Sequence, residues 1–267
     1  MYLLKIELKK LFTYITFWAL MGICFISTFF LALVAKDISS KLNSNIPSIN
    51  TVSWYQFPNV WENLTWLCSY INLFFISIII ITLVCNEYTF RTIRQNAIDG
   101  LSRFEIVIGK IGLIIGLSLF MTLITGLMCL LFGFIYANDN INFFTMFDKI
   151  AYLGDFFIQA IAYGTVAFAI ATLFKRTGIS IVLFFVYKII IESILDWFVF
   201  KESSGDYLPM NLFSALTPNP ITQMAVKAKI HGIEAYSISS PAIECLALVY
   251  ILIIFGLTYL LIKNRDL

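Results

Sequence analysis

The sequence predicts an all-α integral membrane protein with six transmembrane helices, and three observations support this prediction. Of the 267 residues, 60% are hydrophobic and only 13% are charged, whereas a soluble domain of this size carries about a quarter charged residues. The mean hydropathy is +0.88. The apolar residues are grouped in blocks of about 20 or more, the length that an α-helix needs to cross a bilayer. Together these features exclude a soluble globular protein.

Six such blocks can be drawn along the chain. They are Tyr14–Ala35, Leu64–Cys85, Ile106–Ala137, Ile150–Phe174, Ile179–Phe200 and Ile243–Ile262. The third block is longer than a bilayer requires, so we expect it to tilt or to project beyond the membrane. Residues 1–267 are predicted to form one transmembrane domain.

The N-terminal segment Met1–Phe12 predicts a short amphipathic helix in the membrane interface. Its apolar residues Leu4, Leu8, Leu11 and Phe12 share one face. Its lysines lie elsewhere and can extend toward lipid phosphates. They are Lys5, Lys9 and Lys10. A frayed tail before the first span is the alternative.

The distribution of basic residues predicts the orientation in the membrane. An even number of spans places both termini on one side, together with eleven basic residues: Lys5, Lys9, Lys10, Arg91, Arg94, Arg103, Lys110, Lys175, Arg176, Lys263 and Arg265. The other side carries six, spread over longer loops: Lys36, Lys41, Lys149, Lys201, Lys227 and Lys229. The positive-inside rule therefore predicts that both termini are cytoplasmic.

No motif predicts catalysis, and nothing indicates a nucleic-acid partner. The five cysteines lie in or beside apolar runs without CxxC spacing, which argues against a metal site or a disulfide framework. The sequence contains neither a GxxxxGK[ST] phosphate loop nor an HExxH motif, and its single histidine, His231, is in a predicted outer loop. We therefore expect a protein that is not an enzyme and that holds no cofactor of its own.

A polar island, Glu87–Glu105, separates the second and third predicted spans. Within it, Asp99-Gly100 is typical of a helix end, because glycine readily adopts the left-handed conformation. Ser102-x-x-Glu105 is a capping box directly before an apolar run. We therefore expect one cytoplasmic helix over Glu87–Asp99 and a new helix beginning at Ser102.

One face of the expected Glu87–Asp99 helix is suited to binding a partner. The spacing of Arg91, Arg94, Gln95 and Ile98 places them together. Arginine forks and amides can engage a partner's carboxylates and backbone carbonyls. The simpler interpretation is a solvated loop whose arginines only enforce the topology.

The fifth predicted span carries Lys188, Glu192 and Asp196 at intervals of four residues. Ionisable groups at membrane depth normally face a cavity or one another. Lys188 and Glu192 could pair along one face, and Asp155 and Gln159 of the fourth span could join the same polar face. A polar wall along a substrate pathway and a self-compensated structural pair remain equal alternatives.

Two other features concern packing and the outside of the membrane. Gly112-x-x-x-Gly116 begins a small-residue face in the third span, and a second stripe follows in the fourth: Ala160, Gly164, Ala167 and Ala171. Such stripes allow close packing of helices. Residues 201–242 form a large outer loop, whose middle is either a short interfacial or re-entrant helix pair or an ordered external loop.

The island resembles the cytoplasmic coupling segment of type-2 ABC exporter permeases, in particular the short six-span permeases of Bacteroidetes-type bacteria. The matching residues are Glu87, Arg91, Thr92, Arg94, Gln95, Asn96, Asp99, Gly100, Ser102, Arg103 and Glu105. Many relatives have Gly-Thr where this chain has Arg91-Thr92, which favours a subfamily over the family at large.

The resemblance implies a permease subunit of the bacterial inner membrane. It would pair with a second permease chain, identical or related, and with two separate ATP-binding subunits that bind ATP and Mg. The coupling helix would contact the ATPase, with Gly100 and Ser102 joining it rigidly to the third span. The contacts are expected from Arg91, Arg94, Gln95 and Asp99. The resemblance also implies that Lys188 and Glu192 lie near the pathway.

Two other hypotheses remain. An ATP-independent secondary transporter or channel would use Lys188, Glu192 and Asp155 and would respond to ion gradients. An immunity-type membrane subunit would bind a toxic peptide, and it overlaps with the permease hypothesis if it also recruits an ATPase.

Overall fold

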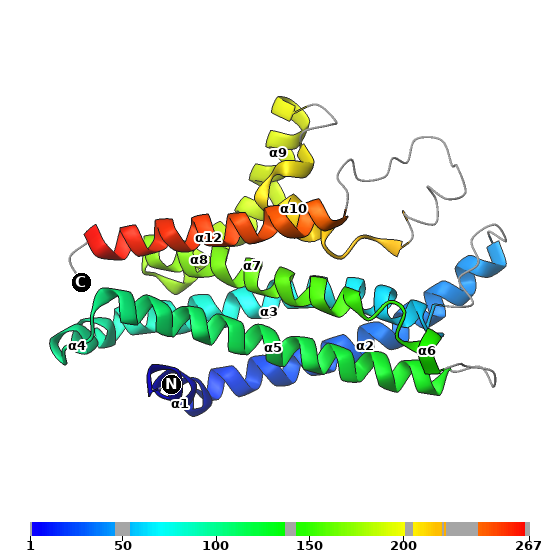
Figure 1. Cartoon of the computed structure of the whole chain (residues 1–267), viewed down its shortest axis with the longest axis horizontal. Coiled ribbons are helices and arrows are strands. Elements are labelled where there is room, and N and C mark those ends of the chain that lie inside the picture. The colour runs from blue at the N-terminus through cyan, green and yellow to red at the C-terminus, as the bar shows by residue number, and fades with distance from the viewer. Residues whose placement is uncertain are drawn as a thin grey trace.

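The computed structural model describes residues 2–45, 54–136, 143–200, 205–220, 222 and 240–264. Every regular element within these ranges is a helix. Six helical segments are long and apolar enough to cross a membrane, and most of them run along one long axis (Figure 1). The predicted all-α membrane fold is therefore confirmed.

The membrane-spanning segments are built from the following helices: α2 (Ile15–Asn45), α3 (Asn59–Thr89), α5 (Arg103–Ile135), α7 (Ala151–Phe174), the consecutive α8 (Thr177–Val186), η1 (Tyr187–Ile191), α9 (Glu192–Leu195) and η2 (Asp196–Phe200), and α12 (Ser240–Asn264). The shorter helices are α1 (Tyr2–Thr13), α4 (Thr92–Ile98), α6 (Phe143–Met146), η3 (Gly205–Tyr207) and α10 (Pro209–Ala215). The predicted spans agree with these to within a few residues.

Helices α4 and α1 and the last turn of α12 lie at one end of the bundle, which we call the α4 end (Figure 1). The third span reaches this end because α5 has 33 residues. At 1.5 Å per residue it is about 50 Å long, against about 30 Å of hydrocarbon. Helix α5 is therefore longer than the bilayer core is thick, as the length of the third apolar block predicted.

Helix α7 is the centre of the bundle and packs against α3, α5 and α12. Its small residues Ala160, Ala167 and Ala171 are fully buried. A Cβ atom added at Gly164 would come within 2.8 Å of side-chain atoms of Ile80 and Ile114. The small-residue stripe therefore packs neighbouring helices within the chain, as predicted.

Three spans are peripheral. The most apolar windows of α2, of the segment Thr177–Phe198 and of α12 are 28%, 17% and 22% buried inside the chain, against 67% for α7. The apolar side chains on these outer faces suit contact with lipid or with another membrane subunit.

The aromatic residues at the opposite end pack inward. Trp54, Tyr55 and Trp61 are all buried in a cluster beside α5. The Tyr55 hydroxyl donates to the Ala32 carbonyl at 2.6 Å. The Trp61 indole donates to the Met146 carbonyl at 2.8 Å. Backbone carbonyls therefore satisfy the polar atoms of Tyr55 and Trp61, which allows both side chains to be buried.

Candidate functional site

The polar island contains a helix break at Phe90 and Arg91 that was not predicted from the sequence. Helix α3 continues through Glu87 to Thr89, and the N–H of Phe90 still donates to the Asn86 carbonyl at 2.8 Å. Arg91 then adopts a left-handed conformation with φ 57°, which ends α3. The separate helix α4 begins at Thr92. The prediction of a single helix over Glu87–Asp99 is therefore wrong.

The other end of the island agrees with its sequence signals. Gly100 has φ 96°, the left-handed conformation that favours glycine. The N–H of Glu105 donates to Ser102 Oγ at 3.2 Å, and the Glu105 carboxylate accepts from the Ser102 N–H at 2.8 Å. The predicted capping box at the start of α5 is confirmed. Helix α4 is thus enclosed by two left-handed residues, Arg91 and Gly100.

The predicted contact residues differ in how accessible they are. Four are exposed, namely Arg91, Arg94, Gln95 and Asp99. Gln95 Nε2 donates to Asp99 Oδ1 at 3.1 Å, one turn along α4. Because Arg91 precedes α4, the helical spacing that grouped it with Arg94, Gln95 and Ile98 does not apply. Gly100 and Ser102 are also exposed, whereas Thr92 and Asn96 are half-buried.

Arg103 has an intramolecular role at the α4 end. Its guanidinium donates to the carbonyl of Ile262 at 3.1 Å and also to that of Lys263. These carbonyls lie in the last turn of α12, where carbonyl groups have no partner within the helix. Arg103 therefore joins the start of α5 to the end of α12.

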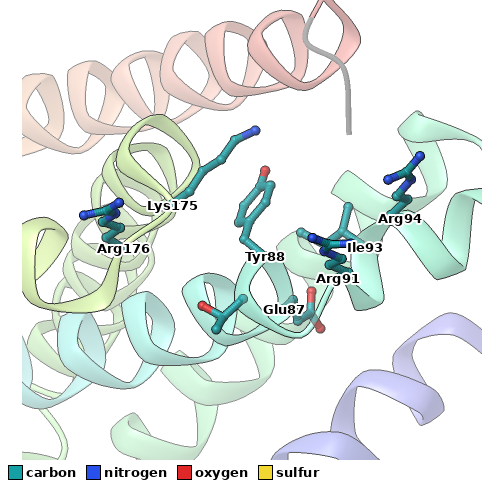
Figure 2. A pocket seen from close by; sticks show the side chains of 8 residues that line it. Glu87, Tyr88, Arg91, Ile93, Arg94, Lys175 and Arg176 are labelled. Atoms are coloured by element: carbon teal, nitrogen blue, oxygen red, sulfur yellow. The ribbon is translucent and has the colours of Figure 1, made fainter.

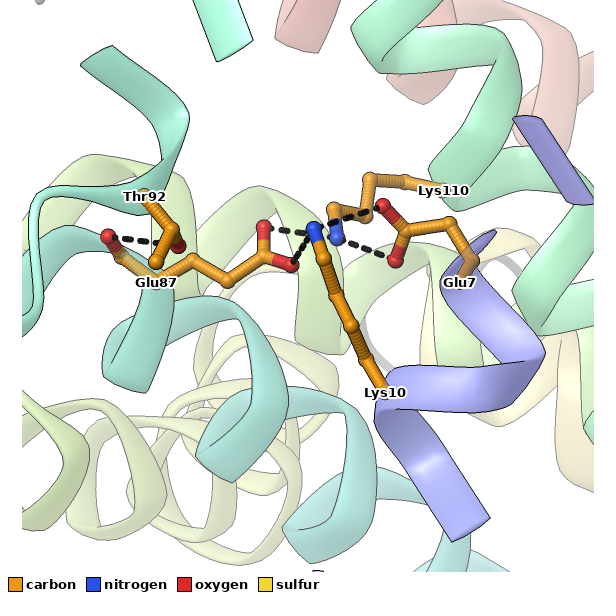
Figure 3. Close-up of polar contacts among 5 residues, drawn as sticks. All are labelled: Glu7, Lys10, Glu87, Thr92 and Lys110. Carbon is orange, nitrogen blue, oxygen red and sulfur yellow. Dashed lines mark hydrogen bonds and ion pairs between the residues drawn. The ribbon is translucent and has the colours of Figure 1, made fainter. Parts of the chain in front are cut away.

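Glu87 also points into the protein rather than toward a partner. Its carboxylate forms an ion pair with Lys110 of α5 at 2.6 Å and a second ion pair with Lys10 of α1 at 3.2 Å. Lys110 pairs with Glu7 of α1 at 2.6 Å, and Lys10 lies 3.5 Å from the same residue. Figure 3 shows these four side chains converging. We call Glu7, Lys10, Glu87 and Lys110 the four-charge cluster.

The four-charge cluster is electrically balanced and largely withdrawn from water. The side chains of Glu7, Glu87 and Lys110 are only 10%, 6% and 4% exposed. Burial opposes the charge of Lys10, but Glu87 and Glu7 outweigh it and raise the pKa of this lysine. Because a buried charge is costly without its partner, the cluster fixes α1 against the ends of α3 and α5.

This cluster was not predicted from the sequence, and the prediction that Lys10 extends toward lipid phosphates is wrong. The amine of Lys10 turns to Glu87 instead, because a buried carboxylate there needs a cation. One signal was available. Glu7 interrupts the apolar face formed by the spacing of Leu4 and Leu11, and an acidic residue on such a face requires a partner.

The charged residues of the fifth span hold an inner helix of the outer loop. The Glu192 carboxylate accepts from the backbone N–H groups of Met210 at 2.8 Å and Asn211 at 2.9 Å, at the start of α10. Lys188 Nζ donates to the Met210 carbonyl at 2.9 Å. None of the ion pairs within the described ranges joins Lys188 to Glu192. Both side chains therefore bind α10 instead of pairing directly.

Helix α10 lies in the predicted large outer loop, residues 201–242, of which 205–220, 222 and 240–242 are described. Met210, Leu212 and Phe213 on it are fully buried, and the helix packs against α7 and α12. Gln159 of α7 donates to the Phe213 carbonyl at 2.9 Å. This part of the loop therefore belongs to the helix bundle, and the basic residues Lys201, Lys227 and Lys229 and His231 lie outside the described residues.

Asp155 and Asp196 have different surroundings. The Asp196 carboxylate packs against Gly205, where an added Cβ atom would overlap with it. Asp155 interacts electrostatically with Glu244 of α12. None of the ion pairs within the described ranges joins Asp155 to Lys188, so the place of Asp155 on a common polar face stays a prediction. Across the described ranges, no group of His, Cys, Asp and Glu side chains could hold a metal ion.

Comparison with protein families decides the class of this chain. The family described as ABC-2 family transporter protein matches residues 3–191, more than two thirds of the sequence. The chain belongs to the ABC-2 transporter family. It is thus a multi-pass membrane protein and an ABC transporter permease that is not itself the ATPase. Comparison with curated proteins gives no match.

The ABC-2 match runs from α1 into η1 and so includes α4 and the whole four-charge cluster. Membership of this family implies partnership with ABC ATP-binding subunits in general. A permease of this kind needs a surface on which such a subunit can dock. Helix α4 exposes Arg94 and Gln95 and is bounded by the left-handed residues Arg91 and Gly100, so it is the candidate for that surface.

Proposed function

We propose that this chain is the membrane-spanning permease subunit of an ATP-driven ABC exporter, and that α4 is its coupling helix. One observation carries the proposal. Helix α4 lies outside the spans, exposes Arg94 and Gln95, and is joined directly to α3 and α5 through the left-handed residues Arg91 and Gly100. A docked subunit that moves α4 therefore pulls on two spans at once.

The joints on either side of α4 explain how movement would reach the bundle. At the α5 side, only residues 99–102 separate α4 from α5, and the Ser102–Glu105 capping box starts the third span. At the α3 side, Glu87 lies in the last turn of the helix and is held by Lys10 and Lys110. Displacement of α4 is passed to α1, α3 and α5 together because the four-charge cluster ties them.

The proposed complex contains two ATP-binding subunits, which bind ATP and Mg, and a second permease chain, identical or related. It resides in the bacterial inner membrane with both termini and α4 on the cytoplasmic side. The excess of basic residues around α4 supports this orientation. The exposed apolar faces of the peripheral spans support contact with a second membrane subunit.

The test is charge reversal at the exposed arginines. The variant Arg91→Glu/Arg94→Glu should insert into the membrane normally but lose substrate-stimulated ATP hydrolysis of the purified complex. The matched control is Lys9→Glu, since Lys9 is an exposed cation of α1 at the same end. Unchanged transport by the double variant would refute the role given to α4.

A further inference from the structure

A cleft lies at the α4 end between two corners of the chain. The corner from α3 into α4 contributes Tyr88, Arg91 and Arg94, and the corner from α7 into α8 contributes Lys175 and Arg176. The cavity has a volume of about 440 Å³. Figure 2 shows Tyr88 between the basic side chains of the two corners.

The two corners are built alike, although they are far apart in sequence. Only Lys175 and Arg176 separate α7 from α8, so these charges cannot extend far from the ends of the spans. Lys175 has φ 56°, close to the 57° of Arg91. Lys175 Nζ lies 5.0 Å from the centre of the Tyr88 ring, a cation–π contact that draws its amine toward the opposite wall.

The charges of the cleft are not balanced within the described ranges. None of the ion pairs there involves Arg91, Arg94, Lys175 or Arg176. Glu87 also lines the cavity, but its carboxylate is engaged by the lysines of the four-charge cluster. Several positive charges around one cavity make its electrostatic potential positive, and this potential attracts an anionic occupant.

We propose that this cleft receives an acidic segment of the ATP-binding subunit. Asp or Glu side chains of that segment pair with Arg91 and Arg94 on one wall and with Lys175 and Arg176 on the other. The inference rests on the proposed function and extends it: the α7–α8 corner is the second half of the docking site. An occupant bound to both walls joins the fifth span to the movement of the second and third.

The shape of the cleft favours a protein segment over a lipid headgroup. Lipid phosphates surround the sides of a helix bundle, whereas one wall here is α4, beyond the last residue of α3 at the end of the bundle (Figure 1). Tyr88 and Ile93 add apolar contact area to the lining. Arginine side chains bind carboxylates in bidentate geometry. An acidic protein segment can therefore pair with the basic residues and also pack against the apolar part of the lining.

The experiment uses the complex purified with its ATP-binding subunit and a zero-length carbodiimide reagent. This reagent activates a carboxylate, which the Lys175 amine then attacks to form an amide, with net loss of water. Mass spectrometry of the linked peptides identifies the carboxylate. Lys175→Arg keeps the charge but removes the amine, so it should retain the ATP-binding subunit and lose the link. Exposed Lys9 and Lys263 at the same end are the reference amines.

Charge reversal supplies the second measurement. Lys175→Glu/Arg176→Glu should weaken retention of the ATP-binding subunit about tenfold or more, because both attractions become repulsions. Links from Lys175 to Asp or Glu of that subunit, above the yields at Lys9 and Lys263, together with this loss support the cleft.

Other outcomes overturn it. Links from Lys175 only to carboxylates of its own chain would do so. Unchanged retention in the reversed variant, with a changed dependence on anionic lipid, would assign the cleft to lipid instead. If Arg91→Glu/Arg94→Glu still uncouples transport in either case, the role of α4 survives and only the second wall is lost. If the unaltered chain retains no ATP-binding subunit, the proposed function and the cleft both fail.

Discussion

Replacing Lys110 with methionine tests the four-charge cluster most directly. The lysine amine lies 2.6 Å from a carboxylate oxygen of Glu7 and 2.6 Å from one of Glu87. Methionine has a similar length and no charge, so it fills the same volume but leaves the two carboxylates facing one another. Lys10, whose side chain is 28% exposed, remains as the single cation between them.

The expected loss of stability can be worked from these distances. Both carboxylate oxygens touch the same amine, so they lie within about 5 Å of one another, and two unit charges at that separation repel by about 3 kcal/mol at an effective dielectric constant of about 20. Removing one partner of a buried ion pair typically costs about 3–5 kcal/mol. By the scaling for domains of 150–250 residues, this loss lowers the melting temperature by about 6–20 °C.

The assay is thermal unfolding of the detergent-solubilised protein, followed by tryptophan fluorescence. Lys9→Met is the control, because it removes an exposed lysine from α1. Adding Glu7→Gln to Lys110→Met restores one cation and one anion, so the double variant should unfold at a higher temperature than Lys110→Met alone. A Lys110→Met protein that melts with the Lys9→Met control, or that gains nothing from Glu7→Gln, would refute the reasoning.

Three smaller predictions follow from the packing and the caps. Gly164→Ala should cost about 1–3 kcal/mol by overpacking the centre of the bundle, measured by thermal unfolding, whereas Gly154→Ala in the same helix should be tolerated because an added Cβ there has no neighbour within 4 Å. Ser102→Ala should cost about 1 kcal/mol at the start of α5, seen as faster amide exchange in its first turn, and Ser102→Thr should preserve the exchange rates. Glu192→Gln should speed amide exchange at the start of α10, because the amide of glutamine provides one acceptor oxygen where two are used; equal rates in Glu192→Gln and in the neighbouring control Ser193→Ala would contradict this role.

The spans could be predicted from the sequence because bilayer thickness constrains helix length independently of tertiary contacts. The capping box was equally readable, since Ser102 and Glu105 satisfy backbone groups only three residues away. The helix break at Arg91 could not be predicted from the sequence. An arginine with a left-handed backbone has no local sequence signal, and helix periodicity alone favoured a continuous helix.

The candidate site could be predicted only where it is local. Exposed Arg94 and Gln95 on α4 follow from a polar segment between two apolar ones. The four-charge cluster depends on contacts such as Lys110 to Glu7, which are 103 residues apart. Lys188 and Glu192 were recognised as costly charges that need partners. Their partners are backbone groups of α10. Every residue has such backbone groups, so the residue types do not reveal which ones are used.

The order of synthesis gives the four-charge cluster a temporal aspect. Glu7 leaves the ribosome 103 residues before Lys110, which at about 5–20 residues per second is an interval of about 5–20 seconds. During that interval its only cluster cation is Lys10, one turn away on the same helix. A nascent chain that stops after the second span therefore holds Glu7 and Glu87 with one lysine to share. Closing of the α4 end awaits insertion of the third span.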